Sequence, residues 1–264
     1  MSRPAQQRAF GVAAGLPEEV CAPLAAACEE AGYASIWAND HPLAKGLDTL
    51  AEFAKGADGI ELGVAVIALD RHDPKAIAAD IERLGLDPSR LWIGVGAGFS
   101  KKPLTFMTEQ IEELRAALPG VRLVMAAMGP KMCALAGSSY DGAFFNWMTP
   151  DFAADARTKV EAGAAEAGHD SPPVFGYVRT AVGPDAAERL AKEESFYRDL
   201  HDGYRNHFAR LGEPEGTVGV AAADRDDAQA KLAAYEALDV IVVRGLASAR
   251  IDPMVELARA AAPA

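Results

Sequence analysis

Residues 90–98 read Arg-Leu-Trp-Ile-Gly-Val-Gly-Ala-Gly, an apolar run that passes into alternating glycines. An unbroken apolar run predicts a strand buried on both faces, because a strand with one solvated face would alternate apolar with polar residues. Segments of helical period lie on both sides of it, at 74–84 and 108–118. The run therefore predicts one unit of an alternating strand–helix sheet.

The same alternation extends along the chain. Eight strands are predicted, at 9–13, 35–38, 60–69, 91–95, 121–127, 142–147, 174–182 and 240–244, and each is followed by a helix. Gly32 and Gly85 are typical helix stops, and Pro17 and Pro74 suit first helical turns. Eight such units in about 250 residues indicate a parallel (β/α)₈ barrel of the α/β class. An open doubly wound sheet is the alternative, but the strand count favours closure.

One connection is longer than the rest. Between Pro184 and Asp239 lie two helical stretches, the first running to about Arg210 and the second at 226–238, where Asp224 is a candidate N-cap. The first stretch carries aromatic residues at roughly helical spacing, which predicts an extra helical segment packed on the barrel between its last two strands. A lid over the barrel mouth is the alternative. We expect residues 1–264 to form a single domain.

The charge, the apolar runs and the cysteines of the chain exclude several classes of function. The formal net charge is −12, with 26 basic and 38 acidic residues, so we expect neither a nucleic-acid binder nor a protein of anionic membranes, since both need a positive face. An acidic ligand would have to be met by a local basic pocket. No apolar run approaches the roughly 18 residues that span a bilayer. The three cysteines have no metal-ligand spacing, and we expect no metal site and a cytoplasmic protein.

Active sites of such barrels lie at the carboxyl ends of the strands. Residues 39–42 (Asn-Asp-His-Pro) follow the second strand there, and His41 is a candidate acid or base near neutral pH, the alternative being a capped loop histidine. Residues 129–131 (Gly-Pro-Lys) open a helix whose free amides suit a phosphate, the alternative being a simple tight turn. The last two strands offer Arg179 and Arg244 at this end. The glycines of 94–98 lack the dinucleotide-binding pattern.

Taken together and in order, these segments resemble the luciferase-like monooxygenase family. The resemblance runs from Ala9 to Val243 and is carried by 32–41 (GYASIWANDH), 62–66 with 71–74 (LGVAV, RHDP), 90–98 (RLWIGVGAG), 126–130 (AAMGP) and 136–142 (AGSSYDG). Members of this family are (β/α)₈ barrels that bind FMN or the 8-hydroxy-5-deazaflavin coenzyme F420, with the ring over the barrel mouth. The resemblance therefore implies a cytoplasmic oxidoreductase that acts on a small molecule, most often as a homodimer.

The resemblance also implies roles for individual residues. A non-prolyl cis peptide would join Ala65 and Val66 and support the cofactor ring. Asp40 and His41 would line the ring as catalytic residues, with His41 the candidate for proton transfer. The remaining cofactor-binding residues would be Gly96 and Gly98 in the pocket, Gly129, Pro130, Lys131 and Met132 at the phosphate, and Asn146 at the cofactor tail.

The chain also departs from the family pattern. It is short, and residues 99–102 (Phe-Ser-Lys-Lys) stand where several deazaflavin-dependent members carry an acidic residue. Three hypotheses follow. The first is F420-dependent hydride transfer, the second is an FMN-dependent monooxygenase that uses reduced flavin and oxygen, and the third is a non-catalytic relative that binds a cofactor or a partner.

Overall fold

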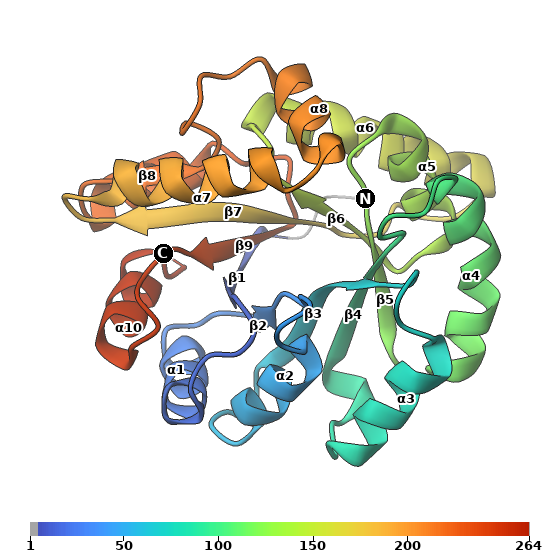
Figure 1. Ribbon diagram of the computed structural model, residues 1–264, viewed down its shortest axis with the longest axis horizontal. Helices are drawn as coiled ribbons and strands as arrows, with labels where there is room; N and C mark the ends of the chain where they lie inside the picture. Colours follow the sequence, from blue (N-terminus) through green and yellow to red (C-terminus); the bar gives the residue numbers. More distant parts are fainter. Residues whose placement is uncertain (1–4, 264) are drawn as a thin grey trace.

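The computed structural model describes residues 5–263 of the chain. All strand pairs are parallel, and eight strands close into a barrel in the order β1-β2-β3-β4-β5-β6-β7-β9, with β9 returning to β1 (Figure 1). The strands are β1 (Gln7–Val12), β2 (Ser35–Ala38), β3 (Glu61–Ala68), β4 (Leu91–Gly96), β5 (Arg122–Ala126), β6 (Gly142–Asn146), β7 (Val174–Val182), β8 (Val220–Ala222) and β9 (Val240–Gly245). The predicted (β/α)₈ barrel is confirmed.

Helices surround the strands (Figure 1). They are α1 (Glu18–Glu30), α2 (Gly46–Ala54), α3 (Pro74–Arg83), α4 (Pro103–Ala117), α5 (Pro130–Ser139), α6 (Pro150–Ala167), α7 (Ala186–Leu200), α8 (Asp202–Leu211), α9 (Arg225–Ala233) and α10 (Ile251–Ala260), with a 3₁₀ turn η1 (Pro88–Arg90) before β4. Helix α3 begins as its sequence predicts, because the Asp73 carboxylate accepts a hydrogen bond from the Lys75 amide and Pro74 occupies the first turn.

The interior of the barrel is filled by side chains at alternate strand positions. This inner cluster comprises Ala9, Trp37, Ala65, Trp92, Val124, Phe144, Phe175, Tyr177, Val240 and Val242. At the amino-terminal end of the strands, Arg122 pairs with Glu61 at 2.6 Å and lies over the Trp92 ring. The barrel is therefore a packed core, and its functional end is the one where the strands finish.

The long connection after β7 differs from its prediction. The first helical stretch is two helices, because His201 is extended and its Nδ1 accepts a hydrogen bond from the Gly203 amide, which starts α8. A short strand, β8, was not predicted, since three residues give no periodic signal. Thr180 of β7 pairs with Gly245 on one side and with Val220 of β8 on the other. The predicted cap Asp224 is confirmed at the start of α9.

Helix α7 lies over β7, and α8 lies against α7 (Figure 1). They form a separate small core, whose buried members are Trp147, Ala181, Ala186, Leu190, Phe208, Val218 and Leu246. Because Trp147 directly follows β6 and Leu246 directly follows β9, this core is built on the carboxyl ends of the strands. Helices α7 and α8, called here the aromatic segment (186–211), thus pack on the barrel and cover one side of its mouth.

Candidate active site at the barrel mouth

Strand register decides which side chains meet at the mouth. Tyr177 pairs with Asn146 of β6 on one side and with Val242 of β9 on the other, and Arg179 pairs with Arg244 two residues further on. Tyr177 and Val242 belong to the inner cluster, so residues two positions later face the same interior. Asn146, Arg179 and Arg244 therefore form the β6–β7–β9 side of the mouth.

The opposite side of the mouth is built around an irregularity in β3. The peptide bond between Ala65 and Val66 is cis, as the resemblance implied, and the register with β4 shifts between Val64 and Ile67. As a result both Ala65 and Val66 pack on the inner cluster, although consecutive residues of a regular strand face opposite ways. Two small side chains therefore face the mouth where a regular strand would present one.

The glycines of β4 fit this irregularity. A Cβ on Gly94 would lie 2.6 Å from the Val64 carbonyl oxygen, and one on Gly96 would lie 3.3 Å from a Val66 methyl group. Gly98 has a φ of +57°, and the amide of the next residue, Phe99, donates to the Asp70 carboxylate. The glycine run thus allows β4 to pass close to the bulge and then turn away from the mouth.

Helix α5 begins directly beyond β5. Gly129 is its N-cap residue, no side chain caps its first amides, and a Cβ on Gly129 would meet nothing within 4 Å. Pro130 and Lys131 are exposed, and Met132 is half-buried. The first turn therefore combines uncapped amides with open space, which is the arrangement that a phosphate group requires.

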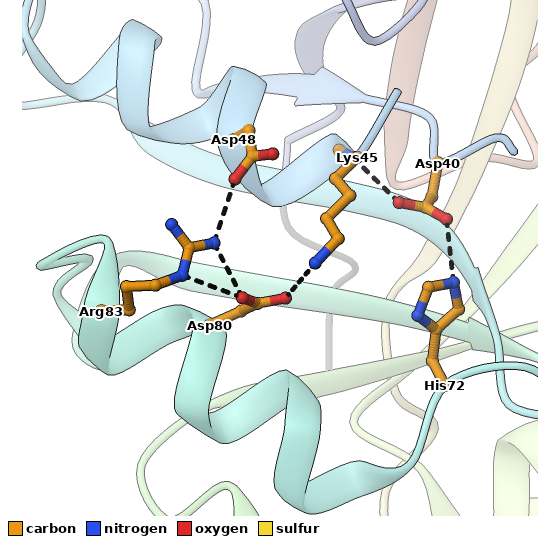
Figure 2. Close-up of polar contacts among 7 residues, drawn as sticks. Asp40, Lys45, Asp48, His72, Asp80 and Arg83 are labelled. Carbon is orange, nitrogen blue, oxygen red and sulfur yellow. Dashed lines mark hydrogen bonds and ion pairs between the residues drawn. The ribbon is translucent and has the colours of Figure 1, made fainter. Parts of the chain in front are cut away.

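Asp40 is held by two contacts at the end of β2. Its Oδ1 accepts a hydrogen bond from the Gly46 amide at 2.9 Å, and its Oδ2 lies 3.4 Å from Nε2 of His72 (Figure 2). The Asp40 side chain is only 6% exposed, whereas that of His72 is 31% exposed. The sequence placed His72 beside Asp73, but its partner in the structure is Asp40, which only the neighbouring arrangement of β2 and β3 reveals.

A second group of charges lies further out along the same two units. Lys45 pairs with Asp80 at 2.9 Å, and Arg83 contacts both Asp80 and Asp48 (Figure 2). These side chains come from α2 and α3 or their ends and are largely exposed. We interpret them as surface ion pairs that join neighbouring helices and that contribute little individually.

His41 lies in a tight turn that forms an antiparallel bridge with Ala44. Its Nδ1 accepts a hydrogen bond from the Leu43 amide at 3.2 Å, and Nε2 lies 3.3 Å from the Ala14 carbonyl oxygen. Acceptance at Nδ1 leaves the proton on Nε2, so these contacts favour one neutral tautomer. The ring is therefore oriented toward the end of β1, beside the mouth.

The Asn146 side chain forms hydrogen bonds with one residue of β7 and one residue of α8. Its Oδ1 accepts a hydrogen bond from Nη1 of Arg179, and its Nδ2 donates to the Tyr204 hydroxyl at 3.3 Å. The Arg179 guanidinium also lies 4.0 Å from the centre of the Trp147 ring and 4.9 Å from that of Tyr197. Sequence reasoning placed Arg179 and Arg244 at this end but gave them no role.

A buried histidine fixes the residue that follows Asn146. Trp147 has a φ of +51°, and its carbonyl oxygen faces Nε2 of His207, which is fully buried in α8. Burial lowers the pKa of His207, which keeps it neutral and donating to that oxygen. His207 thus packs between α8 and the residue that follows β6.

The predicted site residues fall into two groups across the mouth. Ala65, Val66, Gly96 and Gly98 lie on β3 and β4 and the turn after them, next to Asp40 and His41, whereas Asn146 lies on the far side. Gly129 to Met132 lie between these groups. Within residues 5–263, no three His, Cys, Asp or Glu side chains group as metal ligands, and no helix is long and apolar enough to cross a membrane.

The fold and the mouth define a parallel (β/α)₈ barrel with an interrupted third strand and a glycine-lined fourth. The chain belongs to the luciferase-like monooxygenase family, whose model matches residues 106–249. A curated relative, the 5,10-methylenetetrahydromethanopterin reductase of Methanolobus tindarius, is 27% identical over 197 residues, or 61% of this chain and 60% of that protein. The match thus spans about three fifths of the relative's length.

Solved structures with different cofactors share the fold. An F420-dependent secondary alcohol dehydrogenase in complex with an F420-acetone adduct superposes with a TM-score of 0.78 at 16% identity, covering 98% of this chain and 100% of that one. The coenzyme F420-dependent tetrahydromethanopterin reductase of Methanopyrus kandleri gives 0.71 at 18%, covering 96% and 97%. The oxygenating constituent of 3,6-diketocamphane monooxygenase of Pseudomonas putida, in complex with FMN, gives 0.67 at 13%, with 97% of each chain covered.

Proposed function

We propose that this chain is an F420-dependent oxidoreductase that transfers hydride to or from a small organic substrate. The observation that carries the proposal is the interrupted third strand, where Ala65 and Val66 both face the mouth beside glycines of β4. A flat cofactor ring needs a surface on which it can lie close to the protein backbone. Small side chains next to glycine residues provide such a surface. Two of the solved relatives are described as F420-dependent.

The residues present fit the cofactor. Ala65, Val66 and Gly96 would support the ring, and Gly98 would turn the backbone away at its edge. The amides of Gly129, Lys131 and Met132 at the start of α5 would hold the phosphate, because no side chain caps them, and Pro130 would shape this turn without donating. Asn146 would reach the cofactor tail from β6.

The cofactor would supply the carbon that gives or takes the hydride, and this chain would supply position and protons. His41, whose Nε2 lies 3.3 Å from the Ala14 carbonyl oxygen beside the mouth, is the proposed proton-transfer residue, and Asp40 is the proposed second catalytic group. Asp40 is nearly buried and its partner His72 is partly exposed, so we propose His72 as the path of a proton from Asp40 to water. His41→Ala should lower turnover while cofactor affinity stays unchanged; unchanged turnover would remove His41 from the mechanism.

FMN-dependent monooxygenation is the second candidate. It is favoured by the full-length likeness to the FMN-bound monooxygenase structure, which covers 97% of this chain. Both cofactors present a tricyclic ring and a phosphate, so the same support and the same helix start suit either. They differ in chemistry, because the deazaflavin does not support flavin-type activation of oxygen.

The test is a titration of the purified protein with F420 and with FMN separately, followed by fluorescence quenching. Micromolar binding of F420 alone supports hydride transfer, whereas preference for FMN supports the monooxygenase. Binding of neither would overturn both and leave a non-catalytic relative.

Two matched variants locate the phosphate. Gly129→Asp adds a negative charge where the structure has room, so it should fold normally. It should weaken binding of the phosphate-bearing cofactor that the protein prefers, F420 or FMN, at least tenfold while leaving binding of its phosphate-free core, deazariboflavin or riboflavin, unchanged. Ser171→Asp adds the same charge in an exposed loop at the other end of the barrel and should change neither. Equal losses for the cofactor and its phosphate-free core would place the phosphate elsewhere.

The proposal includes a homodimer in the cytoplasm, which rests on the family resemblance. Light scattering of the purified protein measures the assembly: a mass near twice the 27.8 kDa chain supports the dimer, and a mass equal to one chain contradicts it.

A further inference from the structure

Arg179 is the most deeply buried arginine at the mouth and has no carboxylate partner within residues 5–263. It is 2% exposed, and in the described part of the chain its guanidinium makes one hydrogen bond, to the neutral amide of Asn146. Its Nε is buried without any partner. Burying a charge costs several kcal/mol unless the charge is paired and hydrogen-bonded. The aromatic faces of Trp147 and Tyr197 stabilise the cation only in part.

A second arginine lies beside it. Arg244 is the register partner of Arg179 on the neighbouring strand and is 7% exposed. Its Nη1 donates to the Gly245 carbonyl oxygen at 3.1 Å, and its Nη2 lies 4.0 Å from Glu193, at the outer limit of an ion pair. The two buried arginines therefore have only Glu193 as a distant counter-ion, so the pair keeps a net charge of about +1.

Further unused donors surround the two arginines. The Tyr177 hydroxyl and the Trp147 Nε1 are both buried with no hydrogen-bond partner. Burial raises the pKa of Tyr177, so its hydroxyl stays protonated and remains a donor. Buried polar groups in native proteins are nearly always satisfied, and a cluster of unsatisfied donors at a functional end therefore indicates an absent acceptor.

The geometry points to a binding site for a carboxylate group of the substrate, formed by Arg179 and Arg244 with the Tyr177 hydroxyl. This inference rests on the proposed function and names its substrate class: a small organic monoanion. In the closed barrel, β7 and β9 lie across from β3 and β4, so a carboxylate held here directs the rest of the molecule toward the Ala65–Val66 support. A net charge of about one matches a single carboxylate.

The test uses benzoate and acetate as probes, with benzamide and acetamide as neutral isosteres, titrated by calorimetry into the protein with and without bound cofactor. The carboxylates should bind and the amides should not. Arg179→Met and Arg244→Met should each weaken carboxylate binding at least tenfold. Arg205→Met is the matched control, because it removes the same charge from an exposed position on α8 and should leave binding unchanged.

Stability separates a binding role from a structural one. Replacing a buried, unpaired charge by an apolar side chain of similar length is expected to leave the Tm unchanged or to raise it. Arg179→Met should therefore lose carboxylate binding without unfolding. Arg179→Lys, which keeps the charge but not the planar fork, should retain weakened binding.

Three outcomes would overturn the inference. The first is an equal loss with Arg205→Met, which would mean an unspecific charge effect. The second is no carboxylate binding by the wild-type protein at millimolar concentration. The third is that Arg179→Met abolishes the preference for the phosphate-bearing cofactor, F420 or FMN, over its phosphate-free core, which would assign the arginines to the cofactor phosphate. Failure of the proposed function is distinct, since then neither cofactor binds wild-type protein, whatever the carboxylates do.

Discussion

Gly94 of β4 lies against the carbonyl oxygen of Val64 on β3, so closely that a Cβ would come within 2.6 Å of that oxygen and 3.0 Å of the Ala65 Cα. Backbone atoms cannot move aside as a flexible side chain would. The bulge of one strand therefore determines the residue type at one position of its neighbour.

Gly94→Ala should destabilise the protein by about 1–3 kcal/mol, the range seen when a packed site is overfilled. Urea denaturation followed by circular dichroism measures the change. Gly129→Ala is the control, because its Cβ would meet nothing within 4 Å and its stability should stay within about 0.5 kcal/mol of wild type. Equal stability for Gly94→Ala would show that β4 can shift away from the bulge.

Glu194 anchors the aromatic segment beyond β7. Its side chain is fully buried, and it accepts hydrogen bonds from Arg198 and from the Val218 amide. Glu194→Ala should cost on the order of 3 kcal/mol, because it leaves a half-buried arginine and a buried amide without their acceptor. Hydrogen exchange should then accelerate in α7 and α8 before the barrel strands. Asp199→Ala, exposed on the same helix, should change neither quantity.

His207 predicts a dependence of stability on pH. Burial lowers its folded pKa below the ordinary value of 6.5, so the unfolded chain takes up the proton first as the pH falls. This contribution is complete above pH 6.5 and decreases as the pH falls from there toward the folded pKa. His207→Gln should flatten that part of the pH–stability profile measured by urea denaturation. A variant profile parallel to that of wild type would show that other groups cause the slope.

The cysteines should be unreactive in the folded protein. Burial raises the pKa of Cys21 to about 11 and that of Cys133 to about 12, and raises that of Cys28 further. Because the thiolate is the reactive form, a thiol reagent such as Ellman's reagent should label none of the three at pH 8 until the protein is unfolded. Rapid labelling of native protein would reveal local opening around α1 or α5, the helices that carry them.

Much of the barrel could be predicted from the sequence because its strands are continuous apolar runs separated by glycine and proline stops. The ranges 35–38 and 174–182 agree with the structure at both ends. The strand β8 and the break at His201 could not be predicted, since one is three residues long and the other depends on a single extended residue. Both are set by packing on the barrel end.

The site was predictable only in part. Positions at strand ends follow from topology, and the cis peptide at Ala65–Val66 followed from the family resemblance. The contact partners of the site residues could not be predicted from the sequence. The contact of Asp40 with His72 joins residues 32 positions apart, and that of Asn146 with Arg179 joins residues 33 positions apart. The charge state of the mouth could not be predicted either. A chain with a net charge of −12 concentrates two buried arginines there, and only strand register shows that they are neighbours.

Closure of the barrel by β1 and β9 has a consequence for synthesis of the chain. The strand that starts at Gln7 finds its second neighbour only when the strand that starts at Val240 has been made. Until then every nascent chain carries two unpaired strand edges, one on β1 and one on β7, and such edges are prone to pair with other chains. Synthesis of β9 thus converts an association-prone sheet into a closed barrel.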